Sequence, residues 1–366
     1  MLVLLSSLPE KKNPIAIVSN RWTQEFDNHP HIDGSIAMPL RVLRITRDIA
    51  LLVVFAAISH SQIYGQIEKQ TLNTLFIGNS YTGRHNLSEV VETLAEEGNP
   101  QVDFEPIAFI YGGRNLYNHW NLGTQNIVRI NSLTEAEQQA TIARIEEMLA
   151  RDPDWTHGKA ALRRHQELLG NLDDRRVEWD LVVLQSWRDD LEGDASLFVE
   201  YAPKFASIAK EEAARVLLYV TTPNTQNAEP LTAKPDSEPI MEKARTIARL
   251  ANRIGADVAP AFLAGLRCQE QRPDLTLRFV NDAHLNHAMA YLTACSIYSA
   301  IFEKSPEGLS LNEITDIRFF ENDPKNKDKD RDGNPITKVF SEKDRSDLQR
   351  IAWESYLEFD RLRQGL

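Results

Sequence analysis

Apolar residues alternate along most of the chain between short dense runs and longer periodic segments. The short runs, rich in aliphatic and β-branched side chains, are residues 71–78, 102–110, 180–184, 215–221 and 256–261. The longer segments, with apolar residues every three or four positions, are 86–98, 134–149, 159–169, 196–214, 238–254, 286–302 and 342–362. Dense runs of this length predict buried strands, and the periodic segments predict helices. Strands that alternate with helices predict parallel β-α-β units, so we expect an α/β fold with helices on both faces of one sheet.

Two of the predicted helices also carry start signals. Asn86 precedes Glu89 by three residues, and Thr134 precedes Glu137 by three. This spacing is that of a capping box, in which the first side chain accepts from the helix backbone and the second reaches back. We therefore expect helices to begin at both positions, with Gly98 ending the first.

The first 65 residues follow a different pattern. Residues 1–37 show no clear periodicity, whereas from Met38 a basic stretch precedes ten apolar residues, 49–58, and then a small and polar stretch that ends at Gly65. This order predicts a secretory signal peptide over residues 38–65. An apolar run of that length is too short for a bilayer span, which needs roughly 20 residues. The alternatives are a buried helix or a short membrane anchor.

The simplest interpretation has translation starting at Met38, so that residues 1–37 are a misassigned extension. The mature chain would then begin near Gln66, without a stable membrane span, as an exported protein with residues 66–366 in one domain.

Composition narrows the function classes. The chain has 53 acidic and 41 basic residues, a formal net charge of −12, which argues against a nucleic-acid partner. Hydrophobic residues make up 42%, enough for a sizeable core. Cys268 and Cys295 are the two cysteines, too few for a disulfide-rich scaffold or a cysteine-built zinc site, and their pairing stays open.

Candidate chemistry follows the predicted strands, because ligands of parallel sheets bind at the carboxyl ends of the strands. Ser80 comes after the first strand, Gly112 and Gly113 after the second, and Gln185 after the third. His284 precedes a helix and lies near an acid. A nucleophile, a base, an orienting group and amide donors are the parts needed for acyl transfer.

Four motifs make a resemblance specific. They are LFIGNSYT at 75–82, YGGRNL at 111–116, DLVVLQS at 180–186 and NDAHLNHAMAYLTA at 281–294. The first and last resemble the terminal blocks of the SGNH/GDSL hydrolases, with Gly-Asn-Ser in place of Gly-Asp-Ser, and the two middle ones occupy the positions of the inner blocks. The resemblance covers residues 72–302 and implies a three-layer αβα, flavodoxin-like parallel sheet and a serine hydrolase that acts on esters.

The resemblance also implies roles for individual residues. Ser80 would be the nucleophile, and its N–H would form the oxyanion hole with the N–H of Gly112 or Gly113. Gln185 would replace the family's usual Asn as a side-chain donor. His284 would be the general base.

The acid is where this sequence departs from the family. The residue three before His284 is Asn281, and Asp282 lies only two before it. A slightly different loop could let Asp282 orient the imidazole, which is the interpretation we favour. Alternatively Asn281 or a backbone carbonyl orients it, or the site is impaired.

The expected function is an exported serine esterase for a small-molecule or carbohydrate ester, with no required cofactor. The expected substrate contacts are Arg114, Trp187, His119 and Asn224. The alternative is a non-catalytic protein of the same fold that binds a glycan or another ligand, motivated by Asn281 and the altered third block.

The acidic loop at 323–334 has the D-x-D-x-D-G pattern of a calcium loop. Its candidate ligands are Asp328, Asp330, Asp332 and Asn334. Position 12 is Val339 rather than a bidentate Glu, so the pattern is incomplete. A solvated charged loop, a structural calcium site and a calcium-dependent adhesion role remain alternatives.

Overall fold

The computed structural model describes residues 69–186, 196–221, 223–317 and 327–366. The predicted extension and signal peptide lie outside the described residues. Residues 70–366 belong to one compact unit built on a five-stranded parallel sheet. Its strands are β1 (Gln70–Gly78), β2 (Val102–Ile110), β3 (Leu181–Gln185), β4 (Arg215–Tyr219) and β5 (Asp257–Ala259).

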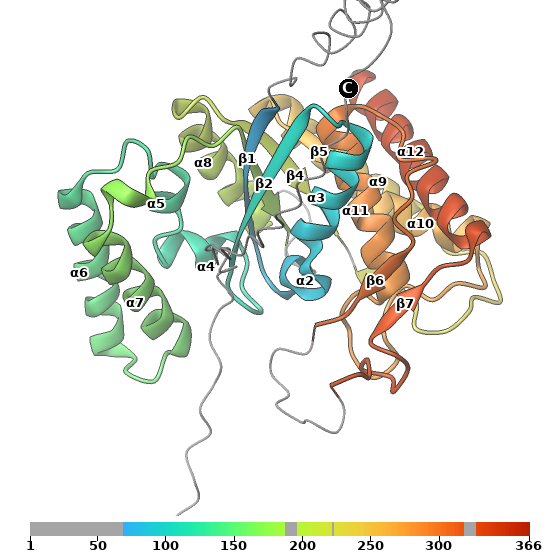
Figure 1. Cartoon of the computed structure of the whole chain (residues 1–366), viewed down its shortest axis with the longest axis horizontal. Helices are drawn as coiled ribbons and strands as arrows, with labels where there is room; N and C mark the ends of the chain where they lie inside the picture. The colour runs from blue at the N-terminus through green and yellow to red at the C-terminus, as the bar shows by residue number, and fades with distance from the viewer. Residues whose placement is uncertain (1–68, 187–195, 222, 318–326) are drawn as a thin grey trace, which may run out of the picture. The chain divides into compact units, whose positions relative to one another are not determined.

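The strand order in the sheet is β2-β1-β3-β4-β5, and all neighbours are parallel (Figure 1). This is the flavodoxin-like order, so the predicted fold class is confirmed. The order reverses direction at β1, and a ligand crevice is expected where connections leave the sheet toward opposite faces.

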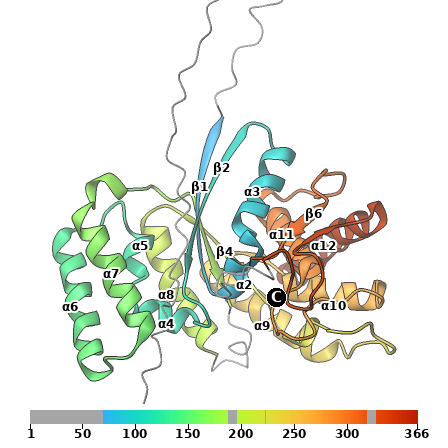
Figure 2. The same ribbon diagram turned by 60° about the horizontal axis from the view of Figure 1, so that its bottom comes forward.

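Helices cover both faces of the sheet (Figure 2). One face packs against α8 (Leu197–Glu211) and α9 (Glu238–Ile254), and the other against α3 (Leu87–Gly98) and α11 (His287–Phe302). The remaining helices are α2 (Ser80–Gly83), α4 (Leu116–Asn121), α5 (Gln125–Val128), α6 (Glu135–Arg151), α7 (Thr156–Gly170), α10 (Ala261–Gln271) and α12 (Glu342–Gln364).

Alternation along the strands divides the core into two layers. In β1, Leu75 and Ile77 join the cluster under α8 and α9, whereas Phe76 joins the cluster under α3 and α11. All three side chains are fully buried. A strand segment that is buried on both faces favours successive apolar residues, which is why Leu75, Phe76 and Ile77 of β1 and the first four residues of β3 form unbroken apolar runs.

Most predicted elements are confirmed, with differences that have local causes. The capping box at Thr134 and Glu137 forms, with both reciprocal hydrogen bonds. The one at Asn86 does not: this residue adopts φ 46°, and its side-chain amide donates to the Glu89 carboxylate at 3.0 Å. Apolar density alone missed α10, and it missed the small antiparallel pair β6 (Glu313–Thr315) and β7 (Thr337–Val339).

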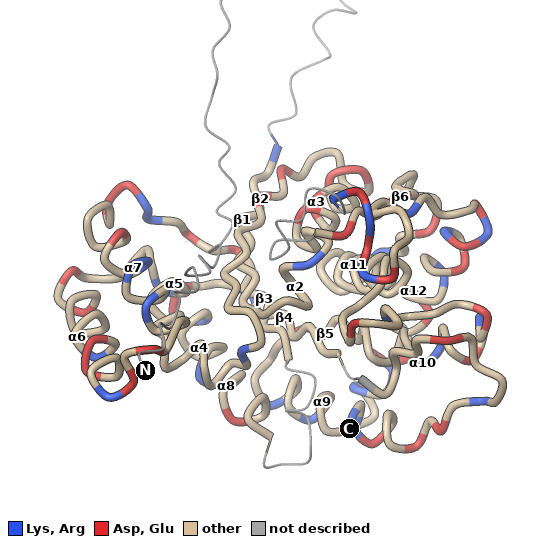
Figure 3. Tube along the Cα trace, turned by 90° about the horizontal axis from the view of Figure 1, so that it is seen from below, with Lys and Arg blue, Asp and Glu red and all other residues tan. Residues whose placement is uncertain are grey.

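Charged residues of both signs are spread over the helices and loops (Figure 3). Among the described residues, none of the helices is long and apolar enough to cross a membrane. Cys268 and Cys295 are both buried, free thiols, so the open question of their pairing is resolved.

Candidate active site

Ser80 is the first residue of α2 and lies directly after the end of β1. The turn is capped by Asn79, whose side-chain oxygen accepts from the Tyr81 N–H at 3.0 Å. A Cβ added at Gly78 would lie 2.5 Å from Oγ1 of Thr82 and 2.6 Å from Oε1 of Gln185. Only glycine leaves room for this turn, which sets the serine at the carboxyl end of the sheet.

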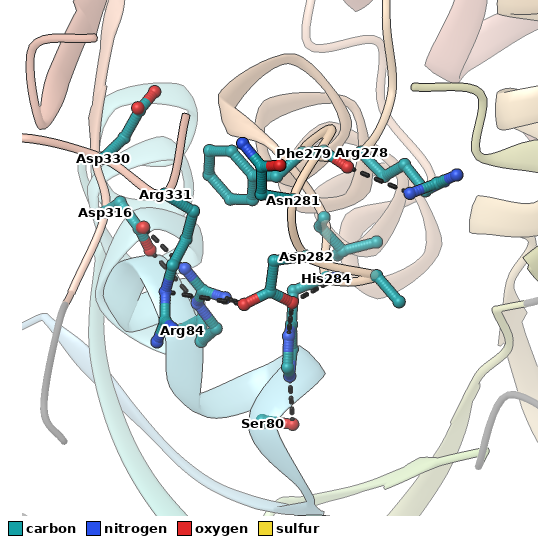
Figure 4. A network of polar contacts seen from close by, with 12 residues as sticks. Ser80, Arg84, Arg278, Phe279, Asn281, Asp282, His284, Asp316, Asp330 and Arg331 are labelled. Carbon is teal, nitrogen blue, oxygen red and sulfur yellow. Dashed lines mark hydrogen bonds and ion pairs between the residues drawn. The ribbon is translucent and has the colours of Figure 1, made fainter. Parts of the chain in front are cut away.

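The hydroxyl of Ser80 contacts His284 across the sheet edge. Its Oγ lies 2.7 Å from Nε2 of the imidazole (Figure 4). The Tyr81 hydroxyl donates to the carbonyl of Ala283 at 3.1 Å, and the Tyr81 ring meets the His284 ring edge-on at 5.5 Å between centroids. Two consecutive residues of the nucleophile turn therefore hold the loop that carries the histidine.

Asp282 binds the opposite nitrogen of the same imidazole. Its Oδ1 is hydrogen-bonded to Nδ1 of His284 and accepts from the His284 backbone N–H at 3.0 Å. Because a carboxylate accepts at Nδ1, the proton resides there and Nε2 faces Ser80 as an acceptor. Burial opposes ionisation of Asp282, but hydrogen bonds from His284 and the positive charge of Arg84 outweigh it and hold the pKa of Asp282 well below its usual range.

Asn281 is turned away from the imidazole. Its backbone N–H and its side-chain amide donate to Oδ1 of Asp332, at 3.0 and 3.3 Å. Of the two residues considered for orienting His284, the structure therefore places Asp282, and not Asn281, against it.

The glycine loop after β2 lies next to the nucleophile turn. Tyr111 N–H donates to Gly78 O at 3.1 Å, and the Asn79 side-chain amide donates to Arg114 O at 3.0 Å. Gly112 and Gly113 lie between the two residues that make these hydrogen bonds, and both glycines are exposed. Gly113 has φ +67°, a conformation that favours glycine. The assignment of their N–H groups to an oxyanion hole stays a prediction.

Gln185 is hydrogen-bonded to the turn that carries Ser80. It is 2% exposed, and its Oε1 accepts from the Asn79 N–H at 2.8 Å and from the Thr82 hydroxyl at 3.0 Å. Its Nε2 donates to the carbonyl of Ser186. These contacts explain a buried amide at this position without an oxyanion, so the donor role of Gln185 stays a prediction.

Only some of the expected substrate contacts have suitable positions. The prediction for His119 is wrong, because its ring is fully buried, with Nε2 donating to Gly78 O at 2.9 Å and Nδ1 bonded to the Thr124 hydroxyl at 3.0 Å. Arg114 is half-buried beside Gly112, and Asn224 is exposed after β4. Trp187 lies outside the described residues.

Several residues of the site carry no recognisable signal in the sequence. His157 is half-buried, donates to Gly112 O at 3.0 Å and lies 3.3 Å from Nη2 of Arg114. Arg84 contacts Asp282, and Asp316 contacts Arg84. Each is an isolated polar residue in the sequence, and only the fold brings it to the site.

The carboxylates of the acidic loop bind backbone N–H groups, and a calcium site there stays a prediction. Both oxygens of Asp332 accept backbone N–H groups, from Val280 at 2.9 Å and Asn281 at 3.0 Å. Oδ1 of Asp330 accepts the N–H groups of Asp332 and Asn334, at 2.9 and 2.8 Å. Within the described ranges, no group of three or more His, Cys, Asp or Glu residues could hold a metal ion. These carboxylates instead close the loop and fasten it to the segment before His284.

The comparisons with known proteins give one kind of match. No family model matches the sequence, and no curated protein does. Similar solved structures include a candidate SGNH hydrolase from Slackia heliotrinireducens, at 16% identity and TM-score 0.38 over 63% of this chain and 100% of that one. A DUF4886 family protein from Bacteroides uniformis aligns at 16% identity and TM-score 0.44 over 79% and 95%. An acetyl xylan esterase variant from Geobacillus stearothermophilus aligns at 11% identity and TM-score 0.37 over 67% and 99%.

One of these names, that of the candidate SGNH hydrolase, is the name of the family that the motifs resemble. At these identities and TM-scores, the functional argument rests on the geometry of the chain's own residues.

Proposed function

We propose that this chain is a serine esterase in which Ser80 forms an acyl-enzyme and His284 is the general base. The observation that carries the proposal is one continuous series of hydrogen bonds, from Ser80 Oγ to Nε2 of His284 and from Nδ1 to Asp282. The three residues have the geometry and the order of partners by which a Ser-His-Asp triad is recognised. The side chain of His284 is 29% exposed, so a substrate can reach its imidazole.

The proposed reaction uses these groups in turn. Ser80 Oγ attacks the ester carbonyl carbon while its proton passes to Nε2 of His284. Asp282 keeps the imidazole in the required tautomer and stabilises the imidazolium that forms. The oxyanion is placed at the N–H groups of Ser80 and of Gly112 or Gly113. The imidazolium then protonates the leaving alcohol, and a water molecule, deprotonated by His284, releases the acid from Ser80.

The surroundings of the glycine loop favour a polar alcohol. Arg114 is partly exposed beside Gly112 and offers hydrogen-bond donors to a hydroxyl-rich substrate, whereas His157 already donates its Nε2–H to Gly112 O. We therefore propose a short O-acyl group on a carbohydrate or another small polar alcohol. The predicted signal peptide over residues 38–65 adds the proposal that the enzyme acts after export.

One of the two observations that motivated the alternative, a non-catalytic ligand-binding protein, no longer supports it. Its motives are Asn281 at the family's acid position and the altered third block, where Gln185 replaces the usual Asn. Because Asp282 binds Nδ1 of His284 instead, a complete set of triad groups is present.

Hydrolysis of p-nitrophenyl acetate and of an acetylated monosaccharide by the full chain tests the proposal. Ser80→Ala is expected to lower kcat by at least about 10³-fold. Ser207→Ala, on the exposed side of α8, is the matched control and should keep the rate of the parent protein. A folded parent protein that hydrolyses neither ester, or a Ser80→Ala variant that keeps full activity, would reject a Ser80 esterase.

A further inference from the structure

We infer that Arg84 and Asp316 form a positioning pair that fixes the carboxylate of Asp282 for the catalytic histidine. The inference rests on the proposed function and adds two positioning residues to it. Neither of them touches the reacting atoms. Both act through Asp282 (Figure 4).

The guanidinium of Arg84 binds two carboxylates at once. Its Nε and Nη2 donate to the two oxygens of Asp316, at 3.2 and 2.6 Å, and its Nη1 donates to Oδ2 of Asp282 at 3.1 Å. The remaining oxygen of Asp282 is the one that binds His284. A planar fork held on one side by Asp316 leaves one position for Nη1, and therefore one orientation for the carboxylate it binds.

Burial makes this arrangement stiff. The side chain of Arg84 is 7% exposed and that of Asp316 is 0% exposed, and the guanidinium carbon lies 5.2 Å from the centre of the Phe279 ring. A buried charge pair cannot readily exchange its partners for solvent, so loss of Arg84 leaves the buried Asp316 carboxylate without its guanidinium partner. Asp316 also accepts the Ile317 N–H, at 2.8 Å.

The pair also lies close to the nucleophile along the chain. Arg84 lies four residues after Ser80, at the C-cap of the short helix α2 that Ser80 begins. His85 and Asn86 come next, with φ values of 59° and 46°, a strained conformation for residues other than glycine. This bend lets Nε2 of the buried His85 donate to Leu285 O at 2.9 Å.

The segment 80–86 thus contacts four consecutive residues, 282–285, of the loop that carries His284, here called the base loop. Ser80 binds His284, and Arg84 binds Asp282. Tyr81 and His85 bind the carbonyl groups of Ala283 and Leu285. A displacement of the acid would therefore have to move the same segment that carries the nucleophile.

The charges around the acid predict opposite electrostatic effects for the two members of the pair. Oδ2 of Asp282 faces both Arg84, at 3.1 Å, and Arg331, at 3.5 Å. Asp316 faces Arg84 and His85, the latter at 3.8 Å, and His287 of α11 is also close enough to feel its charge. Removal of the Arg84 charge leaves less positive charge beside Asp282, whereas neutralising Asp316 leaves the Arg84 charge less compensated.

The test compares Arg84→Met, Asp316→Asn and the double variant in the full chain, with p-nitrophenyl acetate from pH 5 to 9. Arg84→Met is expected to lower kcat by roughly 10- to 100-fold with little change in KM, because misplacement of a catalytic group acts on the chemical step. Its acid limb should shift to higher pH, and that of Asp316→Asn to lower pH. The double variant removes both buried charges and keeps the test valid if Arg84→Met alone does not fold.

Arg267→Met is the matched control, because Arg267 of α10 makes an equally close two-pronged ion pair with Glu358 of α12. It should lower stability without changing kcat or the pH profile. A folded double variant with the kcat and pH profile of the parent protein would overturn the positioning role and leave the Ser80 esterase intact.

A second measurement does not depend on turnover. The proton in the hydrogen bond between His284 and Asp282 gives a downfield NMR signal that Asp282→Asn identifies by its loss. The signal should weaken or move in the double variant and stay unchanged in Arg267→Met. An unchanged signal in the double variant would also contradict the inference, even if the ester assays fail.

Discussion

The side-chain amide of Asn281 donates to the carboxylate of Asp332 at 3.3 Å and so points away from the imidazole that its neighbour Asp282 binds. Two adjacent residues of similar size thereby take separate tasks. Asp282 orients His284, and Asn281 fastens the base loop to the acidic loop. Asp282 lies two residues before His284, one fewer than the acid in the family that the motifs resemble, and it still reaches the imidazole.

The first prediction separates these two tasks. Asp282→Asn is expected to lower kcat by about 10³- to 10⁴-fold, because an amide favours the wrong tautomer and cannot stabilise the imidazolium. Asn281→Ala should cost about tenfold or less, since it removes one hydrogen bond at the far side of the loop. Steady-state kinetics on p-nitrophenyl acetate measure both. A larger loss in Asn281→Ala than in Asp282→Asn would mean that the orienting residue has been assigned wrongly.

The second prediction concerns the turn before the nucleophile. Gly78→Ala is expected to lower the free energy of unfolding by about 1–3 kcal/mol, because its Cβ would overlap Thr82 and Gln185. Gly170→Ala at the end of α7 is the control, since nothing lies within 4 Å of its Cβ. Urea unfolding measures both, and equal stabilities for the two variants would show that the turn can relax.

The third prediction is a loss of stability in mild acid, caused by buried histidines. Burial lowers the pKa of His85 and of His165 to about 4 and that of His119 to about 3. The unfolded chain binds these protons near pH 6.5, whereas the folded chain stays neutral there. Stability is therefore complete above pH 6.5 and falls as the pH drops toward 4, by about 1.4 kcal/mol per pH unit for each histidine.

Thermal melts at pH 7, 6 and 5 measure this slope. His119→Gln, which keeps hydrogen-bonding groups but does not titrate, should remove the contribution of one histidine, about 1.4 kcal/mol per pH unit. A melting temperature that is constant from pH 7 to 5 would be incompatible with neutral, buried histidines.

The fourth prediction concerns the acidic loop. Addition of EDTA is expected to leave both kcat and the melting temperature unchanged, because Asp330 and Asp332 direct their oxygens to backbone N–H groups. Asp332→Ala should nevertheless lower kcat, by roughly tenfold, since it releases the segment before Asp282. A fall in melting temperature with EDTA that calcium reverses would restore the calcium-loop interpretation.

The fold could be predicted from the sequence because local patterns of apolar and capping residues specify the strands and helices. Strand segments buried on both faces favour successive apolar residues, so the second half of β1 and most of β3 stand out as dense runs, and the capping box at Thr134 marks the start of α6. The order of strands and helices then restricts the chain to a parallel sheet with right-handed crossovers. Ser80 and His284 could be nominated for the same reason, because each follows or precedes such an element at the edge where ligands bind.

The choice between Asp282 and Asn281 could not be made from the sequence, since both lie within reach of the histidine and only the loop conformation selects one. The burial of His119 and the support that Gln185 gives to the turn depend on packing from several elements. Arg84 and Asp316 are 232 residues apart, and no periodicity links them. Short-range patterns therefore predicted the elements and nominated Ser80 and His284, whereas the contacts of Asp282 and its support arise between distant segments, which only the folded chain brings together.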